Sequence, residues 1–286
     1  MTTRILITMT DYLKHKNDFN DPDFAAVFDE LPFWSSRFGQ LLFNQIEIRG
    51  GLEILDVGCA SGFPLFELAG VFGNSCRVTG LDIWREALRR AHRKLRFYDA
   101  TNVHVIEADG ARQPFAGATF DLIVSNLGVN NWSDPKAVLA ECFRVAKNDA
   151  RLVLTTNVVG HYHEFYDVFR AILRERNKPE QIEKLDAQEA HRGTKDSLCE
   201  LLRETGWSAF RMIEDRFEMR FLDGSTLLNH SLTKIGFLDS WRSVVNADEE
   251  KEVFEIVERK LNEMASVKGE LRMSVPMLYL DARKAV

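Results

Sequence analysis

Leu52–Ala69, with the sequence LEILDVGCASGFPLFELA, is an apolar run that changes to small residues and then resumes with helical spacing. Its first part, Glu53–Val57, predicts a buried strand because its apolar residues leave no polar alternation for a solvent-facing side. The next residues, Gly58–Gly62, have no bulky side chain, so a ligand can lie against bare backbone there. Pro64 fits the first turn of the following helix, whose first amides favour a carboxylate or phosphate. The stretch therefore predicts a nucleotide-type site.

Two nucleotide-binding patterns can be compared at this loop. In the dinucleotide pattern G-x-G-x-x-G the three glycine positions would be Gly58, Ala60 and Phe63, and the phenylalanine disfavours a nicotinamide cofactor. The loop instead resembles motif I of class I S-adenosylmethionine (SAM) methyltransferases, D-x-G-x-G-x-G, at Asp56, Gly58, Ala60 and Gly62. Ala60 replaces the usual middle glycine, and because alanine is small we expect altered loop geometry rather than a lost site. The alternative is a tight turn without a ligand.

Composition narrows the functional class. The chain has 286 residues, 45% hydrophobic and 28% charged, which is typical of a soluble globular protein with one enlarged domain or a domain with a cap. A net charge of −6 disfavours a nucleic-acid partner. The four cysteines form no C-x-x-C pair, as expected for reduced core residues in the cytoplasm. No apolar run is long enough for a signal peptide or a membrane span.

An acid ends the second buried strand. Asp82 lies 26 residues after Asp56, where a βαβ unit places a ribose-binding carboxylate. The alternative is an N-cap for the helix expected over Arg85–Arg96, and both roles can hold together. Ile83 and Trp84 are expected to flank the adenine. A third strand, 103–108, is followed by Asp109 and Gly110.

The resemblance implies that Asp109 receives the adenine amino group and that Gly110 gives the ring room. The alternative for Asp109 is an ordinary turn residue before a loop. The fourth strand, Phe120–Ser125, leads into the loop Asn126–Trp132, at the strand end where open α/β sheets bind ligands. Enzymes that methylate base amino groups carry an Asn-Pro-Pro-aromatic stretch at this point, and the loop lacks both prolines.

The same loop supplies candidates for donor and acceptor contacts. Asn126 and Leu127 are predicted to contact the cofactor, Asn130 the substrate, and Asn131 the reacting groups. The alternative is that these amides satisfy the loop backbone as turn residues.

Candidate acceptor-site residues also lie on either side of this core. Two apolar helical stretches precede it and are expected to form an N-terminal cap, and in the family that it resembles such helices close over the methyl donor. The candidates there are Tyr12, Phe33 and Trp34. After the fifth strand, His161 and His163 are candidates for substrate binding or for accepting a proton. A metal site is not expected, because the two histidines share a face only on a strand and have no third ligand at suitable spacing.

The alternation of strands and helices predicts a parallel sheet with right-handed crossovers. We expect a Rossmann-like class I methyltransferase sandwich with a mostly parallel seven-stranded sheet and helices on both faces. The resemblance implies that the final two strands pair antiparallel. The expected organisation is a cap over residues 1–48 and a SAM-dependent domain over 49–286, with helical lid insertions around 160–206 and 223–266. Within the second insertion, Asp223–Trp241 is expected to form one helix and Glu249–Met264 another.

The predicted function is transfer of a methyl group from SAM to an O, C or N nucleophile of a small molecule, with S-adenosylhomocysteine as the product. The later segments PFAGATFDLIVSN and RLVLTTN are loosely similar to ubiquinone-type C-methyltransferases and to carboxyl methyltransferases of biotin synthesis. The alternatives are an NAD(P)-dependent oxidoreductase and a SAM-binding protein without turnover. The sequence leaves the oligomeric state open. The predicted cofactor-binding residues are Asp56, Gly58, Cys59, Ala60, Gly62, Asp82, Ile83, Trp84, Asp109, Gly110, Asn126 and Leu127.

Overall fold

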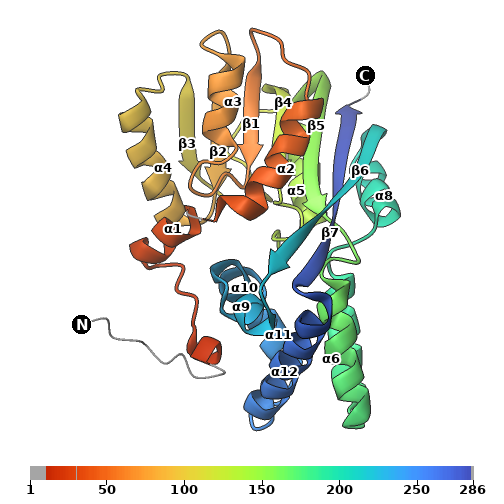
Figure 1. The fold of residues 1–286 in the computed structure, drawn as a ribbon. Coiled ribbons are helices and arrows are strands. Elements are labelled where there is room, and N and C mark those ends of the chain that lie inside the picture. Colours follow the sequence, from red (N-terminus) through yellow and green to blue (C-terminus); the bar gives the residue numbers. More distant parts are fainter. Residues whose placement is uncertain (1–10, 30, 285–286) are drawn as a thin grey trace, which may run out of the picture. The chain divides into compact units, whose positions relative to one another are not determined.

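The computed structural model of this chain describes residues 11–29 and 31–284. Within them, seven strands form one sheet in the order β3-β2-β1-β4-β5-β7-β6 (Figure 1). The strands are β1 (Glu53–Val57), β2 (Arg77–Asp82), β3 (Val103–Glu107), β4 (Phe120–Asn126), β5 (Ala146–Asn157), β6 (Trp207–Phe221) and β7 (Leu271–Lys284). The α-helices are α1 (Pro22–Asp29), α2 (Pro32–Gln45), α3 (Leu65–Phe72), α4 (Arg85–Tyr98), α5 (Pro135–Val145), α6 (His163–Glu175), α7 (Pro179–Ala190), α8 (Lys195–Glu204), α9 (Gly224–Asn229), α10 (Ser231–Gly236), α11 (Leu238–Arg242) and α12 (Glu250–Lys268), and a 3₁₀ helix spans Asp11–Lys14.

The sheet is parallel from β3 to β5 and then changes direction. β1 pairs in parallel with β2 and β4, and the outer pairs β2–β3 and β4–β5 are also parallel. β7 is antiparallel to β5, and the arrows of β6 and β7 point in opposite directions in Figure 1. The predicted seven-stranded, mostly parallel sheet is therefore confirmed. The parallel order also brings the carboxyl ends of β1, β2 and β4 to one edge, where α/β proteins bind ligands.

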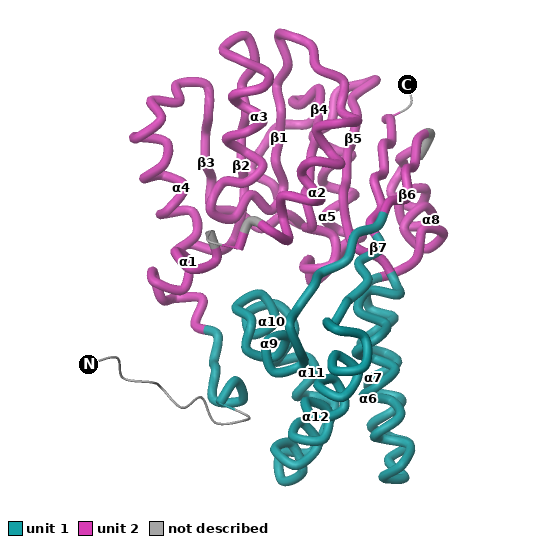
Figure 2. Tube along the Cα trace, in the orientation of Figure 1, with its two compact units in different colours: residues 1–17, 159–192, 216–276 teal, residues 18–158, 193–215, 277–286 magenta. Residues whose placement is uncertain are grey.

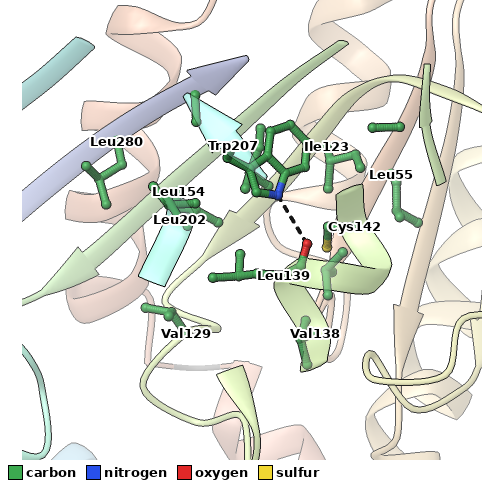
Figure 3. Close-up of a cluster of buried hydrophobic side chains, with 14 of the residues drawn as sticks. Leu55, Ile123, Val129, Val138, Leu139, Cys142, Leu154, Leu202, Trp207 and Leu280 are labelled. Atoms are coloured by element: carbon green, nitrogen blue, oxygen red, sulfur yellow. Dashed lines mark hydrogen bonds between the residues drawn. The ribbon is translucent and has the colours of Figure 1, made fainter. Parts of the chain in front are cut away.

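Helices cover both faces of this sheet. On one face, α5 and α8 pack on alternate strand residues in a continuous apolar cluster (Figure 3). Trp207 at the start of β6 is buried in that cluster, and its indole N–H donates a hydrogen bond of 3.1 Å to the carbonyl of Leu139 in α5. On the opposite face, a Cβ added to Gly80 of β2 would lie 2.7 Å from Leu65, the first residue of α3. The absence of a side chain at Gly80 therefore lets α3 pack closely against β2.

The chain divides into two compact units, which Figure 2 distinguishes by colour. The described part of unit 2 comprises residues 18–29, 31–158, 193–215 and 277–284 and contains the parallel strands, α1 to α5 and α8. That of unit 1 comprises residues 11–17, 159–192 and 216–276 and contains α6, α7 and α9 to α12. The predicted division into a cap over residues 1–48 and inserted lid helices stays a prediction. None of the helices in the described residues is both long and apolar enough to span a bilayer.

Two sequence-based expectations about helices were wrong. The single helix expected over Asp223–Trp241 is three short helices, α9, α10 and α11. The first break occurs at His230, whose backbone is extended and whose Nδ1 accepts a hydrogen bond of 3.2 Å from the amide of Leu232, so that it caps α10. The second occurs at Phe237, whose backbone is not helical. The second difference is smaller: α3 begins at Leu65, so Pro64 is the N-cap residue and does not lie in the first turn.

Candidate functional site

The loop after β1 turns back on the end of β2. The amides of Gly58 and Cys59 both donate to the carbonyl of Leu81, at 2.9 and 3.2 Å, and the amide of Gly62 donates to the carbonyl of Cys59 at 2.8 Å. Gly58 and Gly62 have φ values of +86° and +113°, a region that glycine enters without steric cost. At Gly62 a Cβ would also lie 2.2 Å from the ring of Phe66. Both glycines are therefore required by this backbone path.

Ala60 occupies the left-handed region as well, with a φ of +42°. Its amide donates a hydrogen bond of 2.8 Å to Oδ2 of Asp82 at the end of β2. The replacement of the middle glycine thus keeps the positive φ that the loop needs, at the steric cost that an L residue pays there. On the far side of the loop, the Lys94 ammonium of α4 donates to the carbonyl of Ser61 at 2.9 Å.

Asp82 connects the β1 loop with the start of α4. Its Oδ1 accepts from the amide of Trp84 at 2.8 Å, while Oδ2 accepts from Ala60. Burial raises the pKa of this carboxyl, and the amide hydrogen bonds oppose that rise. The alternative that Asp82 is the N-cap of α4 is wrong in the strict sense, because Trp84 is the N-cap residue and has no side-chain cap. A carboxylate has about four acceptor positions, so two remain for ligand hydroxyls.

The residues expected around an adenine lie beside Asp82. Ile83 is 71% exposed, which is unusual for an isoleucine next to a strand end. The Trp84 indole N–H donates to the carbonyl of Phe19 at 2.7 Å, and its ring contacts three phenylalanines of the segment around α1 at 5.2 to 5.8 Å. Trp84 is thereby fixed against unit 2's own N-terminal segment, while Ile83 stays accessible to a ligand.

Asp109 follows β3, the strand next to β2. Its Oδ1 accepts from the amide of Ala111 at 2.9 Å, as in the turn alternative, and the carboxylate keeps 44% of its surface exposed. Gly110 is partly buried, and a Cβ there would lie 3.3 Å from Val138 of α5. Both residues are predicted cofactor contacts at the same strand edge as Asp82, and these roles stay predictions.

Asp56 is a buried acid of β1, one residue before the strand ends. Its carboxyl is 0% exposed, and neither oxygen has a hydrogen-bond partner of ordinary geometry among the described residues, although the amide of Leu65 faces it. Burial raises the pKa of Asp56 to about 8, and the nearby Asp82 charge adds to that rise. Cys59 is buried as well, and burial raises the pKa of its thiol well above the usual value. A neutral carboxyl and a neutral thiol therefore line this side of the loop at pH 7.

The loop after β4 is held by its own asparagines. Asn126 Oδ1 accepts from the Thr155 hydroxyl at 2.7 Å, and the amide of Leu127, which has a φ of +67°, donates to the carbonyl of Thr155 at 2.8 Å. The Asn130 amide donates to Thr156 and Asn157 of β5 at 2.8 to 3.0 Å. Asn131 is exposed and donates to the carbonyl of Leu127 at 2.8 Å. Of these side-chain contacts, only that of Asn131 is made to the loop backbone, as in the turn alternative, whereas Asn126 and Asn130 bond to β5. Ligand roles for the four residues stay predictions.

Trp132 was not among the site residues predicted from the sequence. A Cβ on Gly58 would lie 3.8 Å from its indole nitrogen, and one on Gly128 would lie 3.0 Å from its ring. The indole therefore lies against the β1 loop, and it ends the same loop that carries the asparagines. The only signal in the sequence was an aromatic residue in a strand-end loop, which is too common to single out.

The predicted acceptor-site residues fall in both units. In unit 1, His161 is buried and stacks on Tyr162 at 4.0 Å, and burial lowers its pKa well below the usual value. Also in unit 1, His163 is exposed, with Nε2 3.2 Å from Glu164, and Tyr12 is buried and donates to Glu258 at 3.2 Å.

Trp34 belongs to unit 2, where its ring contacts Phe38 at 5.3 Å, and its neighbour Phe33 is 70% exposed. No group of three or more potential metal ligands occurs in the described part of the chain. The roles of these residues stay predictions.

The geometry of unit 2 can be compared with known proteins. A family model described as a methyltransferase domain matches residues 48–206, which is more than half of the chain. The chain belongs to this methyltransferase family. A demethylmenaquinone methyltransferase of Lactococcus lactis is 35% identical over 137 residues, covering 48% of this chain and 53% of that protein. The chain thus spans about half the length of the curated relatives it matches.

Solved structures share the fold of this methyltransferase. The YcgJ protein of Bacillus subtilis superposes with a TM-score of 0.58 at 15% identity, covering 88% of this chain and 99% of that one. A SAM-dependent methyltransferase of Aquifex aeolicus gives a TM-score of 0.52 at 22% identity, covering 68% and 92%. The predicted class I SAM-dependent methyltransferase fold is confirmed, and class membership makes SAM the cofactor. The family match does not support the nicotinamide alternative.

The residues at the strand edge fit SAM. Adenosine offers ribose hydroxyls and an exocyclic amino group as donors, and Asp82 and Asp109 present acceptor oxygens at adjacent strand ends. The exposed Ile83 offers apolar surface for a ring. The loop of small residues admits the methionine part against backbone.

Proposed function

We propose that this methyltransferase transfers the methyl group of SAM to an O, C or N nucleophile of a small molecule by in-line displacement. The observation that carries the proposal is the position of Asp82, which is hydrogen-bonded to the β1 loop through Ala60 and lies beside the exposed Ile83. When bound, SAM supplies an already activated methyl group on a positively charged sulfur. The protein then has to hold, orient and enclose the reactants.

Asp82 holds the donor by accepting the ribose hydroxyls with the acceptor positions that Ala60 and Trp84 leave open. Hydrogen bonds to a charged group contribute roughly 1.5–3 kcal/mol, which corresponds to about 10- to 100-fold in affinity. Asp109 accepts the adenine amino group, and the loop Gly58–Gly62 holds the amino-acid end of the donor. In these proposed roles, the acids and the loop at the strand edge together contact the whole donor molecule.

The rate enhancement is proposed to come mainly from alignment of the acceptor with the methyl group. Alignment alone can lower a barrier by roughly 7–11 kcal/mol, so a carboxylate acceptor needs no base. For a hydroxyl acceptor we propose His161 as the group that takes the proton. Burial keeps its imidazole neutral and able to accept a proton at pH 7, and it also makes this imidazole a weaker base than an exposed histidine. The similarity to a demethylmenaquinone methyltransferase supports a small-molecule acceptor.

The test compares Asp82→Asn with Asp99→Asn. Both changes remove one carboxylate charge, but Asp99 is exposed at the C-cap of α4 with a φ of +49°, which asparagine tolerates. Calorimetric titration with S-adenosylhomocysteine should show a 10- to 100-fold loss of affinity for Asp82→Asn and none for Asp99→Asn. Equal affinity in the two variants would overturn the site.

Turnover is tested with radiolabelled methyl SAM and a fractionated pool of cellular small molecules. We expect label to move into a small-molecule fraction with the wild-type protein. Tight binding of S-adenosylhomocysteine with no label in any fraction would favour the alternative of a SAM-binding protein without turnover. Binding of NAD(P) in place of S-adenosylhomocysteine would contradict the proposal altogether.

A further inference from the structure

Unit 1 contains a buried arginine that the proposed function does not use. Arg192 lies two residues after the end of α7 and is only 8% exposed. Its Nη1 donates to the Tyr166 hydroxyl at 3.3 Å and to the carbonyl of Gln188 at 3.5 Å, which are long and uncharged contacts. No carboxylate oxygen among the described residues lies within 4.0 Å of its guanidinium. A buried charge without a counter-ion is costly.

The same unit shows how an internal arginine is ordinarily neutralised. Arg170 of α6 makes ion pairs with Asp167, Asp186 and Glu189, at 3.1, 2.8 and 2.5 Å. Arg192 has no such set, although its side chain is also withdrawn from solvent. The missing counter-charge at Arg192 is therefore a property of this position and not of unit 1 as a whole.

The unused donors of Arg192 form one edge of its guanidinium. Nε and Nη2 have no acceptor among the described residues, and neither is among the fully enclosed polar atoms, so both remain accessible. These two nitrogens are adjacent and point in parallel, which is the geometry that binds the two oxygens of a carboxylate or phosphoryl group.

Aromatic and neutral side chains surround this charge. The guanidinium lies 5.6 Å from the centre of the Phe237 ring, and Trp241 stacks on that ring at 5.7 Å. His161 and Tyr162 lie within the electrostatic reach of Arg192, and burial together with this positive charge keeps the pKa of His161 well below its usual value. These neutral neighbours therefore leave the positive charge uncancelled.

We propose that Arg192 binds the anionic group, a carboxylate or a phosphoryl group, of a small molecule. Nε and Nη2 hold the two oxygens, and the Phe237 ring lies beside the guanidinium. This anion site does not rest on the proposed function. No local pattern indicates this site, because Arg192 lies in a polar stretch that resembles any solvated helix end.

The experiment measures binding of three probes to the full chain without SAM: benzoate, phenyl phosphate and the neutral benzyl alcohol. Calorimetric titrations compare the wild type with Arg192→Met, Arg192→Lys and the control Arg174→Met, an exposed arginine of α6 without an ion pair. We expect at least one anion to bind the wild type and Arg174→Met equally, with a loss of tenfold or more in Arg192→Met. Arg192→Lys should fall between, because an ammonium keeps the charge but not the paired donors. The preferred anion identifies the group.

Urea unfolding gives a second readout that needs no tight ligand. Without an anion, Arg192→Met should unfold at a higher urea concentration than the wild type. Adding about 10 mM of the preferred anion should raise the urea midpoint of the wild type but not that of Arg192→Met. If Arg192→Met does not fold, anion binding is compared between the wild type and Arg192→Lys. Equal anion binding in the wild type and the Arg192 variants, or no binding of either anion, would overturn the proposal. Anion binding that depends on Arg192 in a protein without affinity for S-adenosylhomocysteine would keep the anion site and count only against the proposed function.

Discussion

The amide of Ala60 donates a hydrogen bond of 2.8 Å to Oδ2 of Asp82, so a residue of the β1 loop and a residue at the end of β2 hold each other in place. Ala60 makes this bond with a φ of +42°, in the left-handed region where an L side chain is sterically strained. The carboxylate that we propose for ribose binding is therefore oriented by a backbone conformation that glycine would adopt more easily.

Ala60→Gly should stabilise the protein. Relief of a left-handed alanine gains about 1–2 kcal/mol, and the added freedom of the unfolded chain offsets about half of it. We expect a net increase of about 0.5–1 kcal/mol in the free energy of unfolding by urea, with unchanged or tighter binding of S-adenosylhomocysteine. Ala118→Gly is the matched control, since Ala118 has a φ of +53° in an exposed turn. It should gain similar stability without any change in binding, and destabilisation by Ala60→Gly would contradict the strain argument.

Gly62→Ala should destabilise the loop far more than a simple change of backbone preference. The new Cβ would lie 2.2 Å from the Phe66 ring at a φ of +113°. Gly51→Ala supplies the reference, because Gly51 has a φ of +77° and no atom within 4 Å of its added Cβ. We expect a cost of about 1 kcal/mol for Gly51→Ala and a further 1–3 kcal/mol for Gly62→Ala from overpacking. Equal urea midpoints for the two variants would show that Phe66 moves aside freely.

Asp56 should make stability depend on pH in a defined window. Its pKa is raised by burial from 3.8 to about 8, so between these values the folded protein retains a proton that the unfolded chain releases. This contribution is fully present below pH 3.8 and is lost as the pH rises through 8. The free energy of unfolding of the wild type should therefore fall between pH 5 and pH 8, by up to about 1.4 kcal/mol per pH unit.

Asp56→Asn removes this titration with little change in shape. Its free energy of unfolding should fall less over the same range and exceed that of the wild type by a few kcal/mol near pH 9, of the order set by the shift in pKa. Urea titrations at pH 5, 7 and 9 measure the difference, with Asp99→Asn as a control that follows the wild type. Parallel curves for Asp56→Asn and the wild type would mean that Asp56 is ionised in the folded protein.

His161 provides a test of the proposed base. Because burial keeps its pKa well below 6.5, its imidazole is neutral at pH 7, and turnover of a hydroxyl acceptor should persist as the pH falls through 6.5. His161→Ala should lower kcat by roughly 100-fold or more, whereas His92→Ala, at an exposed position of α4, should have little effect. Turnover like that of the wild type in His161→Ala would remove this residue from the mechanism.

The sheet could be predicted because its buried strands appear in the sequence as short apolar runs. The bounds of β1 agree residue for residue with the expectation. A short apolar run between a turn and a loop of small residues is typical of a buried strand. Asp56 and Asp82 follow from the same pattern, because strand ends fix where their carboxylates lie. The spacing of a βαβ unit leaves little freedom for these positions.

Features that depend on tertiary contacts could not be predicted. The helix expected over Asp223–Trp241 has continuous apolar periodicity, and it is interrupted by the cap made by His230 Nδ1 and by the non-helical backbone of Phe237. Trp132 reaches the β1 loop because β4 brings its loop beside Gly58, a neighbourhood that no local pattern encodes. The isolated charge of Arg192 is visible only when every nearby carboxylate is accounted for in three dimensions.

The place of β7 between β5 and β6 has a consequence for synthesis on the ribosome. β6 precedes β7 in the chain but borders only β7 in the sheet, so it emerges before the strand to which it hydrogen-bonds. Until residues 271–284 follow, the edge of β5 is open and β6 has no place in the sheet. An unpaired strand edge invites association with other nascent chains. The parallel half can form early during translation, and closure of the sheet must wait for its last strand.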